Sequence, residues 1–116
     1  MHIPKPSEVD KATFRSVVPD DPRVEVKPMF GNLGAYVNGN MFMGLFGSDI
    51  GVKLSAADAA TLMAMDGAGP FGPAERPMGG YVSLPVSFIG TPEAAAWVGR
   101  ALDHVGSMPA KQATKR

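Results

Sequence analysis

The chain has 116 residues and a mass of 12.1 kDa, which suits one small domain and leaves no room for two of normal size. Hydrophobic residues make up 45% and charged residues 19%, as is typical of a folded globular protein. Cysteine is absent, which excludes disulfide bonds, a thiol nucleophile and cysteine-ligated zinc or iron–sulfur centres.

The formal charge is balanced, with eleven Lys and Arg residues and eleven Asp and Glu residues. Three of the positive charges, Lys111, Lys115 and Arg116, come at the end of the chain. We therefore expect a single domain over residues 1–108 and a disordered basic tail over residues 109–116. That domain carries eight basic and eleven acidic residues, a net charge of −3, so we expect no direct nucleic-acid binding by it.

No segment has the pattern of a membrane or export signal. The first six residues contain two prolines and lack the apolar core of a signal peptide. The most apolar stretch, residues 41–46, is much shorter than the ~20 residues that a spanning helix needs. We expect a cytoplasmic protein that does not associate with a membrane.

The first half of the chain predicts one helix and a run of strands. Ser7 is a suitable N-cap for a helix over residues 8–18, with Phe14 on its buried side. Alternation of apolar and polar residues then predicts strands. They lie at 24–29, 33–37, 41–46 and 50–54, with turns at Gly31-Asn32, Asn38-Gly39 and Gly47-Ser48-Asp49. Asn38-Gly39 is the strongest hairpin signal, because both residues tolerate the positive φ of a type I′ turn.

The second half predicts two more helices. Ser55 precedes a helix over residues 56–66, and Thr91-Pro92 opens another that reaches Val105. Between them lie an irregular segment rich in Gly and Pro, residues 67–80, and a strand over 80–85. The order is helix, three or four strands, helix, one or two strands, helix. This is the α+β class, with an antiparallel meander sheet and helices on one face.

No residue pattern predicts catalysis. His2 and His104 have no Ser, Asp or Glu at a spacing that suggests a proton relay. Asp20-Asp21 offers too few oxygen ligands for a hard cation. The glycines at 67–69 close a helix, whereas a phosphate-binding glycine run opens one. We expect no enzyme activity, no metal and no cofactor.

Four residues form a candidate site for an anion or small ligand. Lys27 and Lys53 occupy the polar phase of their strands, and together with Arg76 and Tyr81 they can converge on one small pocket. Residues 67–80 would act as its lid. The alternative is ordinary ion pairing with acidic neighbours, which are Glu25, Asp49 and Glu75.

A second candidate site is an apolar contact surface. Met29, Tyr36, Phe42 and Phe46 fall on the mixed side of the sheet and would make that side too apolar to stay exposed to water. The candidate contact residues are Met29, Phe30, Phe42 and Phe46. A second copy of the chain would cover that side, so we expect a homodimer or a contact with a protein partner. The alternative is that helices cover both faces of the sheet.

Several short motifs, taken together, carry a resemblance to a known family. They are Lys-Pro-Met-Phe-Gly at 27–31, Gly-Ala-Tyr-Val-Asn-Gly at 34–39 followed by Met41-Phe42, Ile-Gly-Val-Lys at 50–53, Gly-Pro-Phe at 69–71 and Arg-Pro-Met-Gly-Gly-Tyr at 76–81. In this order they resemble the TfoX N-terminal domain family, whose members are linked to bacterial competence regulation. The resemblance covers residues 8–106 and includes the helix that contains Trp97.

The resemblance implies an α-β-α-β-α fold with an antiparallel sheet and a regulatory role without known catalysis. It supplies no catalytic residues. Longer family members carry a second, helical domain, and only a short segment follows the last predicted helix here, so we expect a stand-alone domain. Our expectation is a non-enzymatic regulatory or protein-interaction domain. The alternative is a small anion- or ligand-binding module that uses Lys27, Lys53 and Arg76.

Overall fold

The structure, a computed structural model, describes residues 4–110. The helices are α1 (Glu8–Val17), α2 (Ala56–Met63) and α3 (Pro92–Gly106), with a 3-10 turn η1 (Val86–Phe88). The strands are β1 (Val24–Met29), β2 (Asn32–Val37), β3 (Asn40–Phe46), β4 (Asp49–Lys53), β5 (Gly69–Pro70) and β6 (Tyr81–Ser83). The predicted α+β class and the order of helices and strands are confirmed. The disorder predicted for the tail falls, from residue 111 on, outside the described residues.

One antiparallel sheet contains the six strands, in the order β1-β2-β3-β4-β6-β5. Two-residue turns join β1 through β4. Asn38-Gly39 has positive φ at both residues, as predicted for a type I′ turn. The first turn is Phe30-Gly31 rather than the predicted Gly31-Asn32, and Phe30 itself takes a φ of 51°. Strand β2 therefore begins at Asn32.

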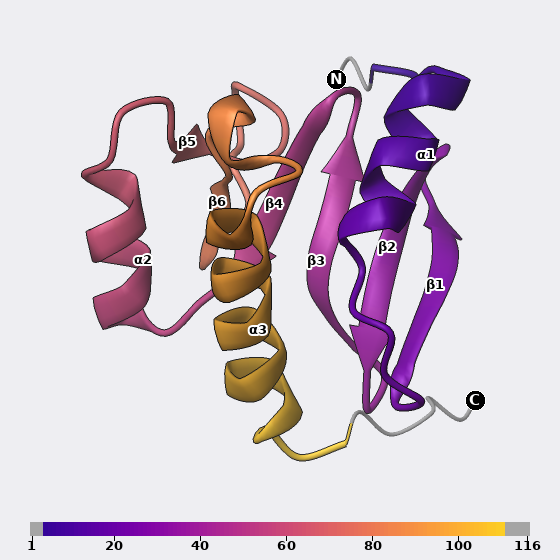
Figure 1. Ribbon diagram of the computed structural model, residues 1–116, viewed down its shortest axis with the longest axis vertical. Coiled ribbons are helices and arrows are strands. Elements are labelled where there is room, and N and C mark those ends of the chain that lie inside the picture. Colours follow the sequence, from indigo (N-terminus) through magenta and orange to yellow (C-terminus); the bar gives the residue numbers. More distant parts are fainter. Residues whose placement is uncertain (1–3, 111–116) are drawn as a thin grey trace.

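Helices cover one face of the sheet, which we call the helix-covered face (Figure 1). Phe14 from α1, Leu62 from α2 and an apolar stripe of α3 pack there against alternate residues of β2, β3, β4 and β6. The stripe of α3 consists of Ala94, Trp97, Val98, Ala101, Leu102 and Val105. These contacts form a continuous hydrophobic core.

The helix starts lie where the capping residues predicted them. Ser7 accepts a hydrogen bond from the Asp10 amide and the Asp10 carboxylate accepts one from the Ser7 amide, a complete capping box. Ser55 and Thr91 cap α2 and α3. Helix α2 ends at Met63, three residues earlier than predicted, and the turn that follows it leaves Asp66 exposed rather than on an inner stripe.

Phe42 is the main disagreement between the pattern and the structure. Strict alternation puts Phe42 on the same side as Phe46, yet Phe42 is fully buried in the helix-covered core beside Met43. The register of β2 and β3 slips here: Ala35 faces Met43 and Tyr36 faces Met41. Phe42 is the extra residue of this β-bulge, and a bulge turns two successive side chains toward one face. Phe42 is therefore a core residue and is not available to a contact surface.

Two further differences lie near the end of the sheet. Strand β6 is shorter than the predicted 80–85, because Pro85 cannot continue the ladder and η1 follows it. Strand β5 was not predicted, since two residues, Gly69 and Pro70, carry no alternation.

Candidate functional site

The candidate site lies on the face of the sheet away from the helices, which we call the second face. A row of small residues crosses it, because Gly34 pairs with Gly44, Gly44 with Gly51, and Gly51 with Ser83. Residues without large side chains leave a trough in the sheet surface. Glycine inside a strand commonly marks such a close approach by another group.

Phe71 fills most of this trough. A Cβ on Gly51 would collide with the Phe71 ring, and one on Gly44 would come within 3.4 Å of its Cζ atom. Phe71 is fully buried and also contacts the rings of Phe46 and Tyr81, at centroid distances of 6.2 and 5.9 Å. The segment 71–80 therefore covers the middle of the second face, which no described helix covers.

An apolar hollow of about 320 Å³ lies beside this segment, at the end of β1. We call it the Phe30 hollow. It is lined by Met29, Phe30, Asn32, Phe46, Pro73, Arg76 and Met78. Arg76 is the one charged residue among them. The Phe30 side chain is 79% exposed, an unusual position for a phenylalanine.

A second hollow of about 440 Å³ adjoins the first and shares Met29 and Met78 with it. We call it the Tyr36 hollow. Its other lining residues include Tyr36, Met41, Lys53, Tyr81 and Met108. The two hollows together form a groove across the second face, with four methionines along it.

Two lysines lie over the aromatic rings of this groove. The Lys53 Nζ atom is 5.1 Å from the Tyr81 ring centroid, and the Lys27 Nζ atom is 4.6 Å from that of Tyr36. Both distances fall within the range of cation–π attraction. Because Tyr81 sits opposite Lys53 across the β4–β6 pair, the sheet register itself sets one of these contacts.

Tyr81 is anchored in its neutral form. Its hydroxyl donates a 2.8 Å hydrogen bond to the Met41 carbonyl. Burial raises the pKa of Tyr81 to about 12, and the nearby Tyr36 adds to that rise. The phenol thus serves as a hydrogen-bond donor and a flat apolar wall, not as an acid at neutral pH.

The structure brings the four predicted anion-site residues to one face but not to one pocket. Lys53 and Tyr81 line the Tyr36 hollow, Lys27 lies against the Tyr36 ring, and Arg76 lines the Phe30 hollow. Among residues 4–110, the ion pairs are Lys11–Glu8, Arg23–Asp21 and Arg100–Asp58. Within the described residues, Glu25, Asp49 and Glu75 form no ion pair with Lys27, Lys53 or Arg76, in contrast to the alternative prediction.

Three of the four predicted contact residues meet at the Phe30 hollow. They are Met29, Phe30 and Phe46, whereas Phe42 lies in the core on the other face. Met78, Met41 and Phe71 were not among the predicted residues. The glycines at 34, 44 and 51 were the available signal, since a glycine inside each of three predicted strands indicates a close approach by another part of the chain.

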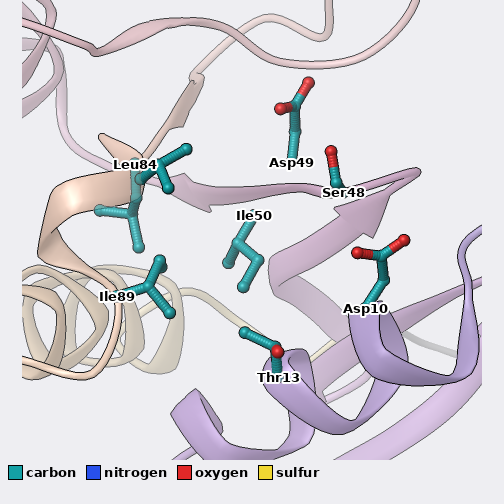
Figure 2. Close-up of a pocket in the computed structure, with 8 residues that line it drawn as sticks. Asp10, Thr13, Ser48, Asp49, Ile50, Leu84 and Ile89 are labelled. Atoms are coloured by element: carbon teal, nitrogen blue, oxygen red, sulfur yellow. The ribbon is translucent and has the colours of Figure 1, made fainter.

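A third hollow, of about 270 Å³, lies on the helix side, between α1, the β3–β4 turn and η1. Figure 2 shows Thr13, Ile50 and Ile89 toward its interior and the carboxylates of Asp10 and Asp49 at its rim. Asp10 is already engaged in the Ser7 capping box. In the described part of the chain, no three His, Asp or Glu side chains gather as a metal site requires.

The fold and the groove together define an α+β domain whose candidate site is an apolar, methionine-lined surface. The chain belongs to the TfoX N-terminal domain family, whose family model matches residues 18–105. The resemblance noted from the motifs is thereby confirmed. Neither the curated proteins nor the solved structures compared with the chain gave a match. Within residues 4–110, no helix has the length and apolar character needed to cross a bilayer.

Proposed function

We propose that this chain is a non-catalytic regulatory domain that acts by protein–protein contact through the Phe30 hollow, and that its partner is a second copy of itself. The observation that carries the proposal is the conformation of Phe30. A bulky residue in the left-handed region costs about 1–2 kcal/mol, and Asn or Gly would occupy the turn without that cost.

The exposed ring brings the isolated domain no compensating burial. In a complex, covering a phenylalanine side chain contributes about 1.5–3 kcal/mol. Met29, Phe46 and Met78 lie around it and extend the apolar surface. Methionine side chains adapt to irregular partners, which suits a contact surface. A regulatory role through contact agrees with the family's link to competence regulation.

Sedimentation velocity over a wide concentration range tests the proposal. We expect the wild type to self-associate at micromolar concentration. We expect Phe30→Asn to have a much larger dissociation constant and so to remain monomeric at that concentration. Val86→Asn is the matched control, because Val86 is 82% exposed but lies at the hollow on the helix side. A wild type that stays monomeric would refute the homodimer. Equal loss in both variants would refute the role of the Phe30 hollow.

A second candidate function is the binding of an amphipathic anion in the same groove. It is supported by three basic residues, Lys27, Lys53 and Arg76. None of them takes part in an ion pair among the described residues. Calorimetric titration with decanoate and with inorganic phosphate tests it. Binding of decanoate that weakens in Arg76→Gln and Lys53→Gln supports a ligand site. If neither decanoate nor phosphate gives a heat of binding, the ligand site is refuted.

A further inference from the structure

The two edges of the sheet differ sharply. At one end, β5 has two residues, one of them proline, and offers little backbone for pairing. At the other end, β1 has six residues, and its four central residues are exposed. A long exposed edge strand is a template for pairing with another chain.

The direction of the free backbone groups of β1 follows from its neighbours. The Phe30-Gly31 turn is a two-residue hairpin, so its flanking pair Met29–Asn32 is hydrogen-bonded, and the bonded pairs alternate back to Glu25–Tyr36. The Val24 amide agrees, because it donates to the Asp21 carbonyl at 2.9 Å and not to β2. Val24, Val26 and Pro28 therefore direct their backbone groups outward.

The sequence of β1 is self-complementary about Val26. In an antiparallel pair of two β1 strands centred there, Glu25 faces Lys27 of the second copy on both sides of the axis. Glu25 and Lys27 point to the second face, at positions where side chains come closest across an antiparallel pair. The side chain of Val26, 37% exposed, would meet its own copy on the other face.

The same register accounts for the groups that cannot donate. Pro28 has no amide hydrogen, and it faces Val24, whose amide is already bonded to Asp21. The central pair exchanges two Val26 N–H···O=C bonds. In this register Phe30 lies opposite Pro22 of the second copy. The contact therefore also reaches the exposed ring of Phe30, on which the proposed homodimer depends.

We infer that two copies of this chain associate by antiparallel pairing of their β1 strands about Val26, which joins the two sheets into one. This inference rests on the proposed homodimer and names its geometry. Two backbone bonds and two charge pairs make a modest interface, to which the exposed ring of Phe30 adds its own contact with the second copy.

Charge exchange at positions 25 and 27 tests the register. Glu25→Lys and Lys27→Glu each place like charges opposite one another twice. We therefore expect the dissociation constant of each variant homodimer to rise about tenfold. The double variant restores opposite charges and should recover wild-type association. An equimolar mixture of the two single variants should form heterodimers in preference to either homodimer.

Glu75→Lys is the matched control, since it makes the same charge change at an exposed loop residue. Circular dichroism checks that each variant is folded. A wild type that is monomeric at several hundred micromolar would refute both the homodimer and the pairing. A dimer that responds equally to Glu25→Lys and Glu75→Lys, with no preference for the mixed pair, would leave the homodimer standing and overturn the β1 pairing.

Discussion

The ring of Phe71 lies against Gly51, in the space that any other residue would fill with its own side chain. Gly44, on the neighbouring strand, lies under the outer edge of the same ring. This contact attaches the segment 71–80 to the second face and thereby places Arg76 and Met78 beside Phe30. The groove therefore exists because the sheet contains glycine at these positions.

Gly51→Ala should displace the Phe71 ring and destabilise the fold. Inserting a methyl group into a packed site typically costs about 1–3 kcal/mol, and here the collision is with a fully buried ring. Urea denaturation measures the change in the free energy of unfolding. Gly79→Ala is the control, because no atom lies within 4 Å of its added Cβ. Equal stability of the two variants would show that Phe71 does not rest on Gly51.

Asn32→Ala should also destabilise the protein, for a different reason. The Asn32 side chain is buried, accepts a 2.8 Å hydrogen bond from the Gly47 amide and donates a 3.2 Å bond to the Pro4 carbonyl. Leaving a buried amide without a partner costs about 1–3 kcal/mol. We expect that loss on thermal or urea unfolding, with faster hydrogen exchange at Gly47. Unchanged exchange there would contradict this assignment.

Phe30→Asn should make the domain more stable while it weakens association. Asparagine accepts the left-handed conformation at position 30, so we expect the free energy of unfolding to rise by about 1 kcal/mol. The free energy of unfolding is measured by urea denaturation at a protein concentration where the wild type is monomeric. Phe30→Ala separates the causes, since alanine removes the ring but keeps the backbone strain. A loss of stability in the asparagine variant would count against a strained turn.

Alkaline pH should weaken the fold through Tyr81. Burial holds the pKa of Tyr81 near 12 in the folded state, above the value of about 10 expected for an unfolded chain. The unfolded state therefore loses the proton first, and stability that is complete below pH ~10 declines as the pH rises toward 12. Tyr81→Phe should remove that decline.

The titration itself can be read directly, because the chain contains two tyrosines. In Tyr36→Phe, the remaining phenol is Tyr81, and its ultraviolet absorbance should change with a midpoint well above 10. A midpoint at the ordinary tyrosine value would show that the Tyr81 hydroxyl is not buried against Met41.

Local signals in the sequence predicted the elements well. Ser7, Ser55 and Thr91 start helices and Asn38-Gly39 makes a turn, because each of these depends on the backbone preference of one or two residues. Met29, Phe30 and Phe46, which line the Phe30 hollow, were likewise visible as apolar side chains outside the core pattern.

The features that the sequence did not predict depend on contacts between distant parts of the chain, which local patterns do not contain. The bulge at Phe42 arises from the pairing of two strands, so alternation within β3 alone assigned the wrong face. The path of residues 71–80 depends on Phe71 meeting glycines from two other strands. Lys27 and Lys53 were assigned to the polar phase of their strands, but the placing of Lys53 and Arg76 in two separate hollows follows from that path.

We propose the groove of the second face as the contact surface of a self-associating domain. A concentration series of methyl NMR spectra with ¹³C-labelled methionine tests it most directly. The methyl signals of Met29 and Met78 should shift as the protein concentration rises, while those of buried Met43 and of Met63 on α2 stay fixed. Shifts confined to Met63, or none at any methionine, would contradict the account.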